Sequence, residues 1–336
     1  MVHMLRPHLL SRFLILITST LLLSGCVENS YYLQCASGQL DIMRRSRPLA
    51  AVIADPQTPP ETRSKLEKVQ VMRTFAVTDL GLPDNKSYRR YADLGRPYAL
   101  WNLVAAPEFS LEPKQWCFPI AGCVNYKGYF KAESAHQLAD ELRSDNYDVN
   151  LYGVQAYSTL NWFADPILNT FINSSETRLA GLLFHELTHQ LIYVEDDSSF
   201  NEALAMSVQI EGVKRWFRQQ ADPEQWQRFQ QGQRQRNRFY NFLRSTRQQL
   251  QALYQRDLPP DSMRSAKQEI ISNALEHYQQ LCLSGQLDGR YDRWMQGGLN
   301  NARLSGIATY RKLLPGFQAL LQQTGGNLEL YFRRVR

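Results

Sequence analysis

Residues 179–194 read Leu-Ala-Gly-Leu-Leu-Phe-His-Glu-Leu-Thr-His-Gln-Leu-Ile-Tyr-Val. The apolar residues of this stretch recur at intervals of four, four, four and three: Leu179, Leu183, Leu187, Leu191 and Val194. That spacing is typical of one face of an α-helix. Since the two histidines lie roughly opposite this apolar stripe, we expect a helix that packs one face into the core and lines a cleft with the other.

The histidines belong to the pentapeptide His185-Glu186-Leu187-Thr188-His189. Side chains four residues apart on a helix differ by about 40° in direction and about 6 Å along the axis, so both imidazoles can reach one ion. Zinc suits such nitrogen ligands, and its catalytic sites usually leave one position to water. Glu186, about 100° round the helix from His185, would lie beside that water and could take its proton. The pattern therefore predicts a metallohydrolase centre, and the alternative is a pair of surface histidines.

A catalytic zinc site usually has a third protein ligand, and Glu202, thirteen residues after His189, is the candidate. The acidic and serine-rich stretch 195–199 interrupts the apolar pattern, and a second helix after it would bring Glu202 back to the metal. The alternative role is local, because Ser199 and Glu202 have the spacing of a capping box. Glu211 is expected to form an ion pair on the opposite side of that helix. The fallback ligands are Glu195, Asp196 and Asp197.

The first 25 residues indicate export. Arg6 and Arg12 precede an apolar run, 13–23, that is too short to span a bilayer, and Leu23-Ser24-Gly25-Cys26 ends it. This segment resembles a bacterial lipoprotein signal, which implies cleavage before Cys26 and acylation of that cysteine as a membrane anchor. Because Val27 and not an aspartate follows, the resemblance implies sorting to the outer membrane of a Gram-negative bacterium, on the periplasmic face. The alternatives are an ordinary signal peptide or an uncleaved anchor.

The other four cysteines suit an exported chain, because disulfides form in oxidising compartments. Cys117 and Cys123 are near enough in sequence to close a small loop, so we expect them to pair with each other. Cys35 and Cys282 would then join the start of the mature chain to its C-terminal part. A metal site at Cys117 and Cys123 is the less favoured alternative, since they lack a two-residue spacing and a second pair.

Cleavage would leave residues 26–336, which we expect to form a single domain because they contain no low-complexity linker and no internal repeat. The formal net charge is +6, and cleavage, which removes Arg6 and Arg12, lowers it to +4. The remaining basic residues are dispersed among glutamines, which argues against a nucleic-acid partner. No feature of the sequence specifies an oligomeric state.

The periodicity predicts a predominantly helical α+β fold with a small sheet just before the histidine helix. Strands are expected at Tyr98–Val104 and Val149–Val154, with a helix around Ser134–Arg143 between them. Residues 223–283 are expected to form two long helices broken at Pro259-Pro260. Further helices are expected at 31–44, 59–80 and 300–323, the last of them ending before Gly325-Gly326.

Besides the pentapeptide, the chain contains several separated motifs, and together they identify a family more specifically than the pentapeptide alone. These motifs are Tyr31-Tyr32-Leu33-Gln34, Trp101-Asn102, Ala106-Pro107-Glu108-Phe109-Ser110, Trp116-Cys117-Phe118-Pro119-Ile120-Ala121-Gly122-Cys123, Tyr126-Lys127-Gly128-Tyr129-Phe130, Ala156-Tyr157-Ser158-Thr159-Leu160, Trp162-Phe163-Ala164-Asp165-Pro166, Phe184 to Gln190, Phe200-Asn201-Glu202 and Asn300-Asn301-Ala302-Arg303-Leu304. With them the chain resembles a family of predicted aminopeptidases from Gram-negative bacteria, many of them lipoproteins, within the gluzincin type of zinc peptidases. The likeness covers nearly all of the mature chain.

The resemblance implies a zincin-like metallopeptidase fold in which His185, His189 and Glu202 bind Zn²⁺ and Glu186 is the catalytic acid or base. The interval between His189 and Glu202 is shorter than in the best-known gluzincins. A gluzincin site usually adds a donor to the developing oxyanion. The candidate donors, each of which could instead be a packing aromatic, are Tyr157, Tyr193 and Tyr310. Asn301 could bind a substrate terminus or cap a helix.

These residues together predict a zinc-dependent peptidase that hydrolyses peptide bonds with water activated by Glu186, and the family implies aminopeptidase action. A peptide substrate would pair with an exposed strand edge, for which Gly153–Tyr157 is the candidate. The membrane would be reached through acylated Cys26. The alternative is a non-catalytic envelope lipoprotein that uses a zinc-peptidase scaffold for binding. The same ligands also accept other divalent metals.

Overall fold

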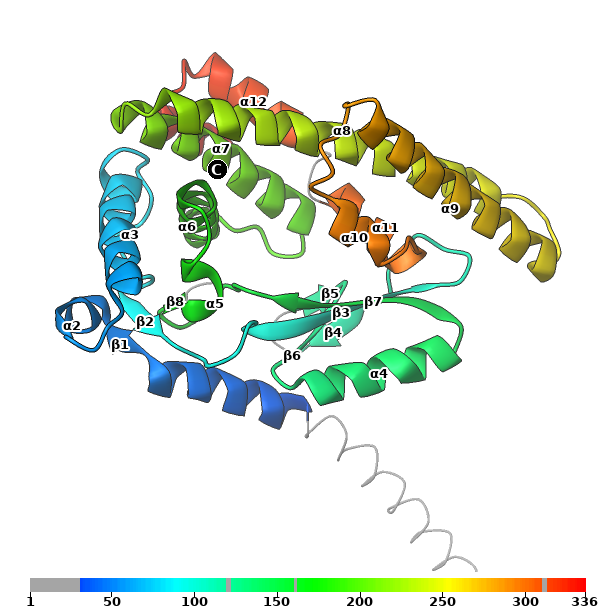
Figure 1. Cartoon of the computed structure of the whole chain (residues 1–336), viewed down its shortest axis with the longest axis horizontal. Helices are drawn as coiled ribbons and strands as arrows, with labels where there is room; N and C mark the ends of the chain where they lie inside the picture. The colour runs from blue at the N-terminus through cyan, green and yellow to red at the C-terminus, as the bar shows by residue number, and fades with distance from the viewer. Residues whose placement is uncertain (1–30, 119–121, 160–161, 310–312) are drawn as a thin grey trace, which may run out of the picture.

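The computed structural model describes residues 31–118, 122–159, 162–309 and 313–336 (Figure 1). Helices contain most of these residues, and the strands are short and belong to three small sheets. The fold is therefore α+β and predominantly helical, as the sequence predicts. Within the described ranges, no helix is long and apolar enough to cross a membrane.

A helix at residues 31–45 begins the described chain. The later helices are α2 (Leu49–Ala54), α3 (Pro60–Thr78), α4 (Ala132–Ser144), α5 (Asn169–Ile172), α6 (Glu176–Leu191), α7 (Ser198–Gln219), α8 (Pro223–Tyr254), α9 (Pro260–Leu283), α10 (Asp292–Gln296), α11 (Asn301–Thr309), α12 (Leu314–Gln323) and α13 (Leu328–Val335). The strands are β1 (Arg47–Pro48), β2 (Arg90–Ala92), β3 (Leu100–Pro107), β4 (Trp116–Phe118), β5 (Gly122–Val124), β6 (Lys127–Tyr129), β7 (Tyr147–Val154) and β8 (Ile167–Leu168).

The sheet that precedes α6 has the order β6-β3-β7, with β3 antiparallel to both neighbours. Successive side chains of β3 point to opposite faces. On one face Leu103 packs with Ala139 of α4, in a small buried cluster. On the other face Asn102 is in register with Tyr152 of β7 and Gly128 of β6. The two longer strands and α4 confirm the predicted small sheet.

The core around α6 is built from helices that lie far apart in the sequence. Side chains of α3, α6, α7, α12 and α13 share the largest buried cluster, and these helices gather round α6 in Figure 1. Leu179, Leu183 and Leu187 are all buried there, which confirms the predicted apolar face. Gly212 of α7 allows a close approach to α6, because a Cβ at that position would lie 2.7 Å from Cδ2 of Phe184.

Helices α8 and α9 form the predicted long hairpin, which crosses the top and right of Figure 1. Pro260 begins α9, where its missing N–H and fixed φ cost nothing. The hairpin has its own buried cluster, in which Phe239 stacks on Tyr291. Its polar outer faces account for the glutamine- and arginine-rich sequence.

The C-terminal prediction is only partly right. Residues 300–323 contain two helices, α11 and α12, instead of one. Gly325 and Gly326 both have positive φ and end α12 as predicted. A further helix, α13, then begins after Asn327, whose side chain accepts a hydrogen bond from the N–H of Leu330. The sequence did not predict α13, because two consecutive glycines usually end a helical region.

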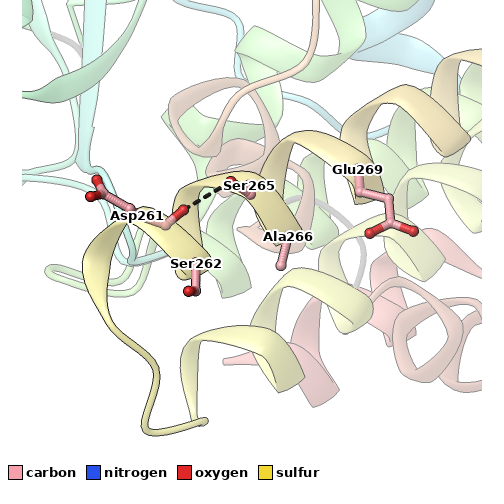
Figure 2. Close-up of a pocket in the computed structure, with 5 residues that line it drawn as sticks. All are labelled: Asp261, Ser262, Ser265, Ala266 and Glu269. Atoms are coloured by element: carbon pink, nitrogen blue, oxygen red, sulfur yellow. Dashed lines mark hydrogen bonds between the residues drawn. The ribbon is translucent and has the colours of Figure 1, made fainter.

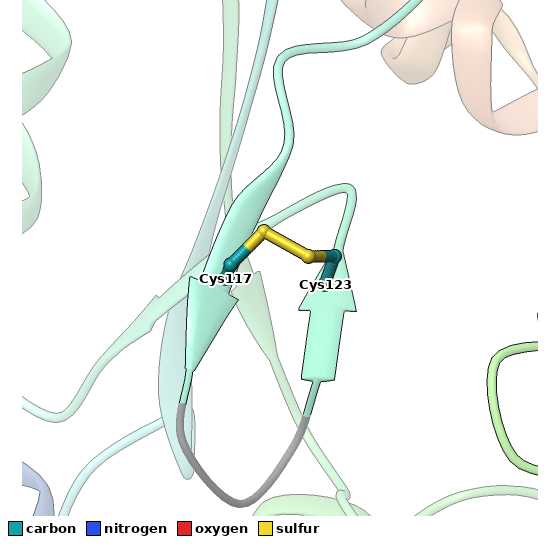
Figure 3. Close-up of a disulfide and its surroundings, with 2 residues drawn as sticks. All are labelled: Cys117 and Cys123. Carbon is teal, nitrogen blue, oxygen red and sulfur yellow. A yellow bond between two sulfur atoms is a disulfide. The ribbon is translucent and has the colours of Figure 1, made fainter.

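The predicted disulfide between Cys117 and Cys123 is present and joins β4 to β5 (Figure 3). Cys35 and Cys282, in contrast, are both free, so the second predicted pairing is wrong. Cys35 lies in the first helix and Cys282 at the end of α9, and these two helices are on opposite sides of the molecule in Figure 1. An even number of cysteines does not show which of them lie close together in the fold, so the count alone could not predict this result.

Candidate metal-binding and catalytic site

Helix α6 brings the two histidines of the pentapeptide to one place. Ser175 starts the helix by accepting a hydrogen bond from the backbone N–H of Arg178. The leucine face is held in the core, and the histidine side chains are therefore directed towards α7. His189 is buried, whereas His185 keeps a small exposed fraction.

His185, His189 and Glu202 form a group whose candidate ligand atoms all lie within 4.8 Å of one another. The two Nε2 atoms are 3.1 Å apart. Oε2 of Glu202 lies 3.2 Å from Nε2 of His185, and Oε1 lies 3.7 Å from Nε2 of His189. We call these three residues the ligand group, and they could hold a metal ion.

The spacing of the ligand group suits a tetrahedral ion. Ligand atoms at about 2.0 to 2.1 Å from such an ion are separated from each other by about 3.3 Å. The measured separations of 3.1, 3.2 and 3.7 Å lie close to that value. Two imidazoles and one carboxylate are also a donor set found at catalytic zinc sites. Both the chemistry and the distances of these residues therefore fit zinc.

The turn between α6 and α7 places Glu202 in the group. The side chain of Asn201 accepts a hydrogen bond from the backbone N–H of Val194 and donates one to its carbonyl, so the start of α7 is tied to the end of α6. Asp197 caps α7 by accepting from the N–H of Phe200. Ser199 is thus inside the helix and not at its cap, so the alternative capping-box role of Glu202 is absent.

The other acidic residues considered as ligands are elsewhere. Within the described residues, the metal-capable cluster contains none of Glu195, Asp196 and Asp197. Asp196 instead lies against the disulfide hairpin, where a Cβ on Gly122 would be 2.9 Å from its Oδ1. Glu211 forms the predicted ion pairs, with Lys214 and Arg215.

Gln209, which the sequence analysis missed, orients His185. Its Oε1, a hydrogen-bond acceptor, lies 3.2 Å from Nδ1 of His185. A ring proton on Nδ1 would be held by this acceptor, which would leave the Nε2 lone pair for a metal. Gly181, one turn before His185, makes room for this amide, because a Cβ there would be 2.9 Å from Nε2 of Gln209. A signal was present, since Gln209 follows Glu202 by seven residues and so shares its helix face.

The two histidines differ in their surroundings. Burial would lower the pKa of His185, but hydrogen bonding to Glu202 and the charge of Glu186 raise it overall. Burial and the neighbouring His185 lower the pKa of His189 to about 4. Nδ1 of His189 is buried and has no hydrogen-bond partner among the described residues. His189 is therefore neutral at physiological pH and retains a lone pair for a metal.

Glu186 lies beside the ligand group without belonging to it. Burial raises the pKa of its carboxyl group to about 7, the charge of His185 opposes this shift, and the negative charges of Glu202 and Asp165 add to it. A carboxylate with a pKa near neutrality can both accept and return a proton. Glu186 could therefore exchange a proton with a group bound at this site near neutral pH.

A buried aspartate joins α6 to the segment before β8. Asp165 accepts hydrogen bonds from Oγ1 and the backbone N–H of Thr159, and from Nε2 of Gln190 in α6. Burial raises the pKa of this carboxyl group despite the bonds from Thr159. Asp165 thereby fixes the chain next to Glu186. Asp165 belongs to a motif of the sequence whose pattern indicates no role for it.

The residues proposed as substrate contacts have different positions. The hydroxyl of Tyr157 donates to Oε1 of Gln39, so it is directed into the contact with the first helix. Tyr193 is half-exposed near the ligand group, and its pKa is raised by burial and by Asp196, Glu195 and Glu202. Tyr310 lies outside the described residues.

Asn301 has a structural role. Its side chain is fully buried, and its Nδ2 donates to the carbonyls of Pro107 and Glu108. Its Oδ1 accepts from the hydroxyl of Tyr254. These bonds occupy the amide, so the structure does not present Asn301 to a substrate terminus. The residue instead ties α11 to the end of β3.

Tyr126, between β5 and β6, is a further aromatic residue near the ligand group. The side chain is 46% exposed, but the protein around it, the nearby Tyr152 and the charge of Glu202 raise the pKa of its hydroxyl to about 12, and Glu186 contributes in the same direction. The hydroxyl is therefore protonated at neutral pH and can donate a hydrogen bond. Tyr126 belongs to one of the motifs found in the sequence, but its spacing there indicates no role, because only the fold of the sheet brings it near Glu202.

The predicted strand edge is partly present. Gly153 and Val154 end β7, which is an outer strand of the sheet. The carbonyl of Gln155 accepts a hydrogen bond from the hydroxyl of Thr170 and is not available for pairing. Any extended ligand would therefore pair along β7 before residue 155.

A separate shallow depression lies on α9 (Figure 2). Its lining consists of Asp261, Ser262, Ser265, Ala266 and Glu269. Ser265 donates to the carbonyl of Asp261 within the helix, and Arg264 pairs with the same aspartate. The surface contains no histidine or cysteine and belongs to the hairpin, so it is not part of the ligand group.

Comparison with known proteins identifies the family to which the chain belongs. A family model described as "Putative aminopeptidase" matches residues 30–336, and the chain therefore belongs to that family. No curated protein and no solved structure matches the chain. The match includes the ligand group, Glu186 and both helices that carry them.

Proposed function

We propose, from the premise that the chain is a member of this aminopeptidase family, that it is a zinc-dependent enzyme that removes residues from the N-termini of peptides. The convergence of His185, His189 and Glu202 next to Glu186 is the observation that carries the proposal. Zinc is the proposed metal because the donor set and its spacing suit a tetrahedral ion. The fold would then be a variant of the zincin type with a short interval between its second and third ligands.

In this mechanism each side chain has one role. When bound by the ligand group, zinc would lower the pKa of a water molecule and polarise the scissile carbonyl. Glu186 would accept the proton of the attacking water and return it to the leaving amine, for which a pKa of about 7 is suitable. Gln209 would keep His185 in the required tautomer. Tyr126 would donate a hydrogen bond to the oxygen that gains negative charge.

The test of this function is profiling of a mixed peptide library by mass spectrometry, with zinc-loaded protein and with Glu186→Gln. Loss of single N-terminal residues, in the wild type only, is the expected result. Internal cleavage would keep the peptidase assignment but overturn the aminopeptidase one. Peptide binding with no cleavage across the library would support a non-catalytic scaffold.

Gln209→Leu should weaken zinc binding by about 10- to 100-fold, since the variant removes the acceptor that orients His185. The measurement is competition with a chelator of known affinity. Gln219→Leu is the matched control, because Gln219 is exposed at the end of the same helix. Equal zinc affinity in both variants would show that Gln209 does not orient the ligand.

Tyr126→Phe should lower kcat by about 100-fold or more and leave zinc content unchanged, because it removes one hydrogen-bond donor to the transition state. Steady-state kinetics measure the effect, with a substrate in which one amino acid is joined to a fluorogenic dye through an amide bond. Tyr32→Phe is the control, since Tyr32 is exposed on the first helix. An increase in KM with unchanged kcat would assign Tyr126 to ground-state binding instead.

We propose further that Cys26 is acylated and anchors the protein to the periplasmic face of the outer membrane. The support is the sequence Leu23-Ser24-Gly25-Cys26 after an apolar run, with Val27 following. Cys26→Ala should abolish incorporation of a labelled fatty acid and release the protein from the outer-membrane fraction. Acyl labelling that persists in this variant would contradict the proposed site.

A further inference from the structure

The helix at residues 31–45 is firmly attached to the body of the protein along one face. Oε1 of Gln34 accepts a hydrogen bond from the backbone N–H of Phe130. Gly38 lies against the ring of Phe130, since a Cβ there would be 2.1 Å from its Cγ. Ile42 is buried in the main core, and Tyr31 stacks on Phe118. The orientation of this helix is therefore fixed by packing.

The opposite face of the same helix is apolar and exposed. Its large side chains have exposed fractions of 42% for Tyr32, 69% for Leu33, 48% for Leu40 and 44% for Met43. Leu33, Ala36, Leu40 and Met43 follow intervals of three, four and three residues and so form a single stripe. We call these residues, with Tyr32, the outer stripe. An exposed apolar stripe on a helix whose orientation is fixed is typical of a surface that contacts a membrane or another protein.

The charges around the outer stripe are mainly positive. Arg44 and Arg45 are exposed at its C-terminal end. Asp93 lies near Arg45, and Asp41 is paired with Arg45 and Arg96. Two arginines thus share one carboxylate, and Arg44 adds a further positive charge. Basic residues beside exposed apolar side chains favour a surface of anionic lipids.

We infer that the outer stripe lies on the surface of the lipid bilayer and sets the orientation of the protein there. This inference rests on the acylation of Cys26 proposed above. The five steps from Cys26 to Tyr31 can extend over at most about 18 Å. The acyl chains would therefore keep the start of the helix close to the headgroups. A second, weaker contact would add to the attachment that the acyl chains give and would fix the orientation of the protein on the surface.

The test uses the acylated full-length protein in vesicles of phosphatidylethanolamine and phosphatidylglycerol. A small environment-sensitive fluorescent amino acid replaces Leu40 in one sample and Leu283 in the other. Leu283 is the matched control because it is 89% exposed at the end of α9, on the other side of the molecule. We expect a blue shift and quenching by brominated lipids at position 40 and neither effect at position 283.

A second sample separates lipid contact from other causes of the shift. In this sample the fluorescent residue replaces Met43, and the substitutions Leu33→Glu and Leu40→Glu are added. These charges should keep the stripe out of the lipid, so the emission at position 43 should become water-like. Leu283→Glu should leave the emission at position 43 unchanged. We expect these variants to fold, because Leu33, Leu40 and Leu283 are exposed. Circular dichroism checks this.

Flotation of the vesicles distinguishes the two proposals. Protein that floats with the vesicles but shows water-like emission at positions 40 and 43 would overturn the docking of the outer stripe and leave the anchor intact. Protein that fails to float would overturn the anchor, and the docking inference would fall with it. A blue shift that brominated lipids do not quench would indicate contact with a second copy and would also overturn the inference.

Discussion

Glu186→Gln is expected to lower kcat for peptide hydrolysis by roughly 10²- to 10⁴-fold while zinc content stays at the wild-type level. The carboxamide has nearly the shape of the carboxylate but cannot accept the proton of the attacking water. Zinc should be retained because the ligand group consists of His185, His189 and Glu202. Steady-state kinetics and elemental analysis of the same preparation measure the two quantities.

The control for this variant is Glu269→Gln, an exposed glutamate on α9. It has the same chemical change and should keep full activity. A Glu186→Gln protein with undiminished turnover would contradict the role of Glu186 as acid or base. Loss of zinc in that variant would instead show that the side chain contributes to metal binding.

Glu202→Gln is expected to abolish stable zinc binding and, with it, peptide hydrolysis. The neutral amide is a weaker ligand than the carboxylate, whose oxygens are 3.2 and 3.7 Å from the histidine nitrogens. At a free zinc concentration 100 times its Kd, the wild type should gain about 2.7 kcal/mol of stability, and the variant should gain none at the same concentration. Thermal unfolding with and without zinc, together with the zinc content after dialysis, measures this loss.

Glu211→Gln in the same helix is the matched control. Glu211 pairs with Lys214 and Arg215, and partly exposed ion pairs of this kind contribute about 1 kcal/mol or less. This variant should therefore keep the zinc-dependent gain in stability. Full zinc occupancy and activity in Glu202→Gln would require a different third ligand and would contradict the proposed site.

The sequence was most informative where a pattern is local and periodic. Leucines at every fourth residue placed the helix of the pentapeptide in the core, and the histidines therefore had to face away from it. The break between α8 and α9 was predictable as well, because Pro260 can begin a helix but cannot continue one. The Cys117 and Cys123 pair was also predictable, since six residues suffice for a tight hairpin.

Errors occurred where an outcome depends on distant parts of the chain. Cysteine counting suggested that Cys35 pairs with Cys282, but packing holds them on different elements. The spacing of Ser199 and Glu202 equally allowed a capping box, and Asp197 became the cap instead. Asn301 was considered as a substrate contact, whereas its amide joins α11 to β3.

By itself, the sequence determined that His185 and His189 can reach one metal ion and that Glu186 lies beside them, because a single helix sets the spacing of these three residues. Tertiary structure alone decided that Glu202 completes the group, since this requires the contact of α6 with α7 that Asn201 secures. It also brought Gln209 to His185. The physical reason is that helix geometry is a property of neighbouring residues, whereas the meeting of two helices depends on burial throughout the core.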